Sequence, residues 1–150
     1  MKQCLIRQPA GVGDIFFCQK IAKKIVEKYN IDVVWPVIPE FEWLKGCLNA
    51  NRISYVSLTS DYKGKELYNS SCNTITDTDD LLYVPLQYAD QHMFHHSAMV
   101  CKYNLVSLSH TDWAEFLNFN RNVKREDKLF YDILGLTDED KYVLVNKNYG

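Results

Sequence analysis

A strand–helix–strand pattern in the first 35 residues constrains the fold more than any other feature of the sequence. A short apolar run at residues 4–6 leads into a loop. Residues 15–29 then repeat apolar side chains at i, i+4 spacing, which is typical of an amphipathic helix. A second apolar run at residues 31–35 stops at Pro36. Because such crossovers are right-handed, the two strands are expected to lie parallel in one sheet.

The alternation of helix and strand patterns continues along the chain. Residues 61–80 are polar and predict a loop with at most one weak strand. We expect further helices at residues 39–48, 91–103, 111–118 and 124–134, and further strands at 53–58, 81–86 and 141–146. This order predicts an α/β fold with an open parallel sheet and helices on both faces. Its core should contain Leu5, Val33, Val34 and Leu82 on strands and Ile21 and Ile25 on a helix.

Length, charge and cysteine content narrow the class of protein. A chain of 150 residues, 47% of them hydrophobic, suffices for one domain with a sizeable core. The formal net charge of -2 gives no general attraction to nucleic acid, and no apolar stretch has the length of a membrane span. Five cysteines without a C-x-x-C pair predict buried thiols in a reducing compartment. We therefore expect a cytoplasmic protein without disulfides or structural zinc.

The last ten residues look like the beginning of another β-loop-α unit. A strand pattern at residues 141–146 runs into a turn that ends on Gly150. We therefore expect residues 1–140 to form one domain and residues 141–150 to begin a second, truncated one. In that case residues 142–146 should pair poorly with the main sheet.

The loop and helix start RQPAGVGDIFF, residues 7–17, can be explained in three ways. It can cradle a phosphate, position a catalytic carboxylate or cap a helix. In open α/β sheets ligands bind beyond the carboxyl ends of the strands, where this loop lies. The dinucleotide pattern G-x-G-x-x-G fails because Phe16 stands at the third glycine and Asp14 stands near the pyrophosphate. The phosphate-binding pattern of P-loop proteins is also absent.

Asp14 fits the two remaining explanations. Aspartate is a common N-cap, where its side chain accepts a hydrogen bond from a backbone N–H. The same side chain can face a cleft and act as a general base, although the helix dipole favours its charged form. We expect Asp14 to cap the helix through one oxygen while the other stays exposed at the carboxyl edge of the sheet.

Three stretches of the sequence resemble the N-terminal half of GT-B glycosyltransferases, and most closely the heptosyltransferase group in glycosyltransferase family 9. They are Cys4-Leu5-Ile6-Arg7, then Gly13-Asp14-Ile15 at a helix start, then Val33-Val34-Trp35. The resemblance implies two Rossmann-like domains, the first holding the acceptor and the second the nucleotide-sugar. It also implies that Asp14 deprotonates the acceptor hydroxyl, without a metal or a resident cofactor.

The resemblance leaves the acceptor open. The loop contains Gln8-Pro9-Ala10, which departs from the heptosyltransferase pattern, and basic residues for an acceptor phosphate are not evident. Residues expected to shape the loop or contact the acceptor are Gln8, Gly11, Val12, Gly13, His95 and His96. His92 and His96 share a helix face but lack a third ligand, so we expect no metal site. Lys102 and Arg121 could contact a phosphate, but we expect them to be solvated.

The predicted function is therefore transfer of a sugar from a nucleotide-sugar donor to a saccharide or glycan acceptor, with Asp14 as the base. One alternative is a non-catalytic α/β ligand-binding or regulatory domain in which Asp14 is only a cap. A second alternative is a nucleotide-dependent oxidoreductase. Predicted partners are the donor and the acceptor, without nucleic acid.

Overall fold

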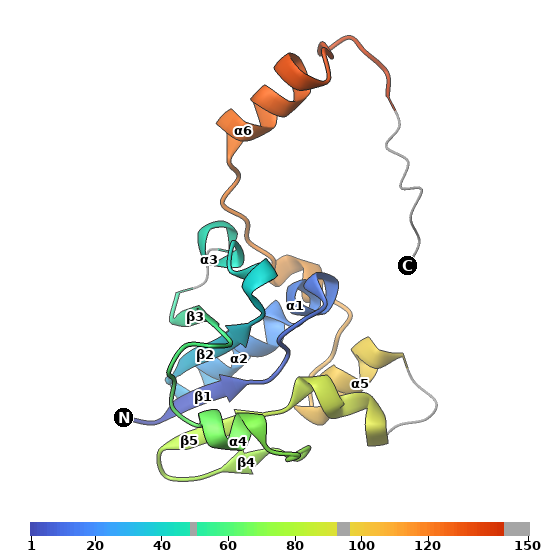
Figure 1. Ribbon diagram of the computed structural model, residues 1–150. Helices are drawn as coiled ribbons and strands as arrows, with labels where there is room; N and C mark the ends of the chain where they lie inside the picture. Colours follow the sequence, from blue (N-terminus) through green and yellow to red (C-terminus); the bar gives the residue numbers. More distant parts are fainter. Residues whose placement is uncertain (49–50, 93–96, 143–150) are drawn as a thin grey trace. The chain divides into compact units, whose positions relative to one another are not determined.

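A computed structural model describes residues 1–48, 51–92 and 97–142 and divides the chain into two compact units, Met1–Asn120 and Arg121–Gly150. The first unit is an α/β domain with a five-stranded sheet of order β3-β2-β1-β5-β4 (Figure 1). Its strands are β1 Gln3–Ile6, β2 Asp32–Val37, β3 Ile53–Ser57, β4 Thr76–Asp77 and β5 Leu81–Val84. All neighbouring strands pair in parallel except β4, which is antiparallel to β5. This arrangement confirms an α/β fold with a mostly parallel sheet.

Both faces of the sheet are buried. Alternate residues of a strand point to opposite faces, so Cys4 and Ile6 join one core cluster while Leu5 joins another. Helix α2 (Gln19–Tyr29) packs on the first face, and α4 (Lys65–Asn69) contributes Tyr68 to the second. Five of the six residues predicted for the core are confirmed as buried, namely Leu5, Ile21, Ile25, Val33 and Leu82. The sixth, Val34, is partly buried.

The predicted first helix is two helices. Helix α1 (Val12–Phe17) ends at Cys18, and α2 follows directly. At the break, the carbonyl of Phe17 accepts a hydrogen bond from the hydroxyl of Tyr103, which gives this carbonyl a partner outside the helix. The i, i+4 pattern is nearly continuous through the break, so the sequence did not reveal it.

Other predicted helices are shorter than expected. The regular helices are α3 (Leu44–Cys47), α4 and α5 (Ala98–Leu105), and short 3₁₀ turns are η1 (Pro39–Phe41), η2 (Leu86–His92) and η3 (Trp113–Phe116). Helix α4 and strand β4 both lie in the segment 61–80 that was predicted as loop with one weak strand. Hydrophobic spacing alone does not distinguish a full helix from one or two tight turns.

Strand β2 does not stop at Pro36, contrary to prediction. Pro36 pairs with Val56 of β3, whereas the pairing of β2 with β1 ends at Val34. The missing N–H of Pro36 therefore lies beyond the end of the ladder with β1, where it removes no sheet hydrogen bond.

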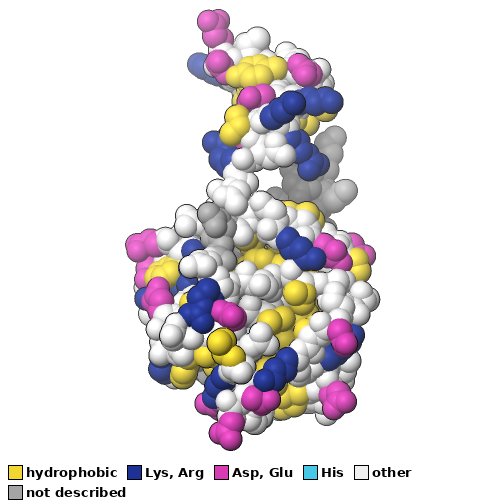
Figure 2. All heavy atoms as spheres, turned by 90° about the vertical axis from the view of Figure 1, so that its left-hand side faces the viewer, with side chains coloured by type: hydrophobic (Ala, Val, Ile, Leu, Met, Phe, Trp, Pro, Cys, Tyr) yellow, Lys and Arg dark blue, Asp and Glu magenta, His cyan; other side chains and the backbone are white. Residues whose placement is uncertain are grey.

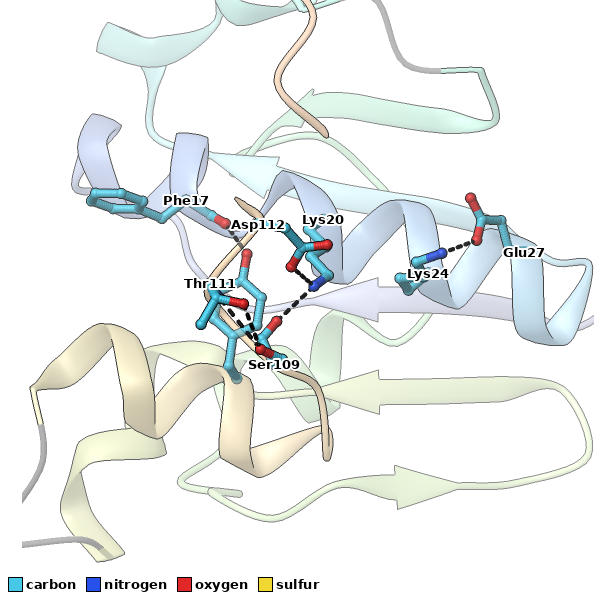
Figure 3. Close-up of polar contacts among 8 residues, drawn as sticks. Phe17, Lys20, Lys24, Glu27, Ser109, Thr111 and Asp112 are labelled. Carbon is cyan, nitrogen blue, oxygen red and sulfur yellow. Dashed lines mark hydrogen bonds and ion pairs between the residues drawn. The ribbon is translucent and has the colours of Figure 1, made fainter. Parts of the chain in front are cut away.

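Two buried side chains of α2 make polar contacts with the rest of the first unit. Lys20 extends from α2 to the carboxylate of Asp112 and to the carbonyl of Ser109, 2.7 Å away (Figure 3). Gln19 accepts a 2.7 Å hydrogen bond from the hydroxyl of Tyr55 on β3. Both α2 side chains are buried, whereas the Asp112 carboxylate is 40% exposed.

The second unit contains a short α-helix, α6 (Val123–Asp127), that continues as the π-helical η4 (Lys128–Ile133). This agrees with the helix predicted at residues 124–134. Leu129, Ile133 and Leu134 are all at least half exposed. Most of the strand predicted at residues 141–146 lies outside the described residues, which end at residue 142. Its pairing therefore stays a prediction.

Candidate functional site

The loop after β1 lies at the switch point of the sheet, because β2 and β3 continue the sheet on one side of β1 and β5 and β4 on the other. Strand β1 stands between β2 and β5, the arrangement in which open α/β sheets bind ligands beyond the strand ends. The backbone N–H of Arg7 donates to Val84 at 2.9 Å, and the carbonyl of Pro9 accepts from Ile38 at 3.0 Å. The loop is therefore fastened to the end of β5 and to the residue that follows β2.

The two glycines of the loop have different environments. Gly11 precedes α1 with a φ of 80°, and a Cβ built on it would meet Oδ2 of Asp14 at 3.0 Å. Gly13 lies inside α1, and a Cβ built on it would meet nothing within 4 Å. Val12, the first residue of α1, packs against the core. Only Gly11 is required by the backbone conformation.

Asp14 is not the N-cap of the helix, contrary to prediction. The helix starts at Val12, which places Asp14 at its third residue, and Gly11 at the cap position has no side chain to accept a hydrogen bond. The prediction placed the helix start at Ile15 and so located the cap three residues too late. The side chain of Asp14 is 42% exposed, at the carboxyl edge of the sheet.

Two buried polar side chains face the Asp14 carboxylate. Nε2 of Gln8 lies 3.4 Å from Oδ2 of Asp14, and Nζ of Lys102 lies 3.9 Å from the same oxygen. Lys102 also donates to Oε1 of Gln8 at 2.7 Å and to the carbonyl of Leu86 at 3.1 Å. Gln8 is 4% exposed and Lys102 is 5% exposed.

Sequence reasoning missed Lys102, which was expected to be solvated. A signal was present, because Lys102 stands among apolar residues in the stretch Met99–Leu105 and has no acidic residue one helical turn away. A lysine in such surroundings is rarely buried without a partner. Its partners, Gln8 and Asp14, are about 90 residues away in the sequence, so they could not be identified from local spacing.

The electrostatics of the site come from one buried cation and one half-exposed carboxylate. The nearby Cys18 thiol is buried, and burial raises its pKa to about 12, while Lys102 opposes and Asp14 reinforces this shift. Cys18 is therefore neutral near pH 7. The arrangement offers a partly exposed carboxylate whose Oδ2 faces the amide of Gln8 and the ammonium of Lys102.

The structure does not describe two further candidate residues of the sequence. His95 and His96 lie outside the described residues. Among the described residues, no group of three His, Cys, Asp or Glu side chains is arranged to hold a metal ion. A groove of about 320 Å³ lies elsewhere, between α2, β5 and residues 105–108, and no residue of the loop lines it. The carboxylate chemistry therefore does not coincide with this groove.

Basic and acidic side chains are interspersed on the face of the first unit that Figure 2 shows, without a large area of one charge. In the described part of the chain, no helix is long and apolar enough to cross a membrane. No protein-family model matches the sequence, and no match was found among curated proteins or solved structures.

Proposed function

We propose that this chain is the acceptor-side part of a GT-B glycosyltransferase and that Asp14 is its general base. The observation that carries the proposal is a carboxylate at the carboxyl edge of β1, 42% exposed and backed by the buried Lys102. A general base must be within reach of the hydroxyl whose proton it takes, and the exposure of the Asp14 side chain supports this role. The resemblance of residues 4–7, 13–15 and 33–35 to the heptosyltransferase group supports the same role.

The reaction is a substitution at the anomeric carbon of the donor sugar. The acceptor oxygen forms a bond to this carbon while its proton passes to Asp14. The bond between the anomeric carbon and the donor phosphate breaks, and the electron pair leaves with the nucleoside diphosphate. A second domain would hold the nucleotide, so residues 1–120 supply the acceptor side and the base.

The position of Asp14 disfavours the oxidoreductase alternative. In dinucleotide-binding folds, the pyrophosphate approaches the glycines of the first loop and the start of the following helix. Here Oδ2 of Asp14 lies 3.0 Å from the place of a Cβ on Gly11, so a negative charge already occupies that approach. A pyrophosphate would meet a like charge at close range.

The test uses the full-length protein with UDP-, GDP- and ADP-linked sugars and a set of mono- and oligosaccharide acceptors. We expect nucleoside diphosphate to be released only when both a donor and an acceptor are present, with a glycosylated product detected by mass spectrometry. EDTA should leave the rate unchanged. If an acceptor binds the protein but no donor is consumed, the non-catalytic binding domain is the correct alternative.

A further inference from the structure

We infer that Lys102 is a positioning residue for Asp14: together with Gln8 it holds Oδ2, so that Oδ1 is the oxygen that takes the acceptor proton. This inference rests on the proposed function and assigns separate roles to the two oxygens of the carboxylate. It concerns residues from three segments of the chain, namely the loop after β1, helix α1 and helix α5.

Lys102 is held in place by hydrogen bonds that do not involve Asp14. Its Nζ donates to Oε1 of Gln8 at 2.7 Å and to the carbonyl of Leu86 at 3.1 Å. Gln8 is fixed in turn, because its Nε2 donates to the carbonyl of Ala10 at 2.6 Å and its own carbonyl accepts from Nε1 of Trp35 at 3.0 Å. Since Lys102 and Gln8 are both buried, they have few other conformations, and Asp14 adjusts to them.

The two oxygens of Asp14 have different surroundings. Both donors face Oδ2, at 3.4 Å from Gln8 and 3.9 Å from Lys102. Among the described residues no hydrogen bond reaches Oδ1. An ammonium and an amide N–H cannot accept a hydrogen bond, so a proton on Oδ2 would point at groups that only donate. Oδ1 has no such neighbour and can receive the proton from solvent or from a bound hydroxyl.

Among the described contacts of Lys102, the one to Asp14 is with a carboxylate and the others are with neutral oxygens. Gln8 and Leu86 offer neutral oxygens, and the Cys18 thiol beside it stays neutral because burial raises its pKa. A buried ammonium is costly unless a negative charge lies close by. The negative charge that meets this need is the one on Asp14, the residue that we propose reacts.

The experiment compares Lys102→Met with a matched control in the full-length protein. Lys20→Met is the control, because Lys20 is also 5% exposed and also paired with a carboxylate, that of Asp112, which is not part of the loop (Figure 3). Gln8→Met is a second variant, which removes the hydrogen bond from Gln8 to Oδ2 and keeps Lys102. Thermal unfolding, kcat and KM for donor and acceptor are measured for all three, using the donor and acceptor that give turnover.

We expect kcat to fall about 10- to 100-fold in Lys102→Met, as for other misplaced catalytic groups, with KM for the donor unchanged. Gln8→Met should lower kcat in the same direction, and Lys20→Met should lose thermal stability while keeping kcat. Equal kcat in Lys102→Met and Lys20→Met would overturn the inference, even if Lys102→Met is less stable. If Lys102→Met does not fold, an unchanged kcat in Gln8→Met overturns it. Absence of turnover in the wild type would instead overturn the proposed function, and this inference with it.

Discussion

At the residue scale, alanine substitutions at Gly11 and Gly13 should have opposite effects on stability. Gly11→Ala places a Cβ at positive φ and within 3.0 Å of Oδ2 of Asp14, so both the backbone and the carboxylate must shift. We expect it to destabilise the protein by about 1 kcal/mol or more and to lower the transfer rate. Gly13→Ala lies in a helix with open space around it and should stabilise by up to about 1 kcal/mol. Urea unfolding of both variants measures the difference, and equal losses would contradict the structure.

We expect the thiol of Cys72 to be more reactive than the buried thiols of Cys4 and Cys18. Hydrogen bonds with the Thr74 backbone and the Thr76 hydroxyl lower the pKa of Cys72, whereas burial raises the pKa of Cys4 and Cys18. The thiolate is the reactive form, so Cys72 should react first with a disulfide reagent at about pH 8 in the folded protein. Mass spectrometry of partly labelled protein identifies the site. Labelling of Cys4 or Cys18 before unfolding would show that the core is open.

Part of the candidate site could be predicted from single residues. Gln8, Gly11 and Asp14 share one short loop and helix start, so the sequence alone places them together beside the end of a strand. Lys102 comes from α5, and only the folded sheet brings it to the same loop. The cap role of Asp14 was wrong because positive φ at Gly11 starts the helix earlier than hydrophobic spacing indicates.

At the element scale, buried strands were predictable and helix lengths were not. The short apolar or alternating segments at residues 4–6, 31–35, 53–58 and 81–86 each contain an observed strand, because short segments rich in β-branched and aromatic residues favour strands. At the break at Cys18, the Phe17 carbonyl accepts a hydrogen bond from Tyr103, and in β2 Pro36 lies past the end of the pairing with β1. Both contacts are tertiary, so local patterns do not contain them.

The contact between α2 and β3 can be measured with Tyr55→Phe. The Tyr55 hydroxyl donates to the buried Oε1 of Gln19 at 2.7 Å, and its loss leaves that oxygen without its partner. We expect a loss of about 1–3 kcal/mol in the free energy of unfolding, the cost of an unsatisfied buried acceptor. Tyr131→Phe is the control, because its hydroxyl bonds to Asp138 at the surface and should matter by less than about 0.5 kcal/mol. Similar losses for both would mean that Gln19 is not buried in solution.

At the scale of the whole molecule, the two units should differ in stability. The helical segment Val123–Ile133 has no buried residue, and a helix of this length is marginal in water without packing. Arg121, Lys124, Arg125 and Lys128 are exposed in this unit. Limited trypsin digestion of the 150-residue chain should therefore cleave there first and leave a resistant fragment of the first unit. First cleavage at Lys63 would contradict this division.

The direct test of the central claim is the transfer rate of Asp14→Asn in the full-length protein. Asparagine keeps the size of the side chain but cannot take a proton at neutral pH. With Asp14 as the base, kcat should fall by about 10² or more, while donor affinity and melting temperature stay close to those of the wild type. Transfer at the wild-type rate by Asp14→Asn would contradict the account, and Asp14 would then have no catalytic role.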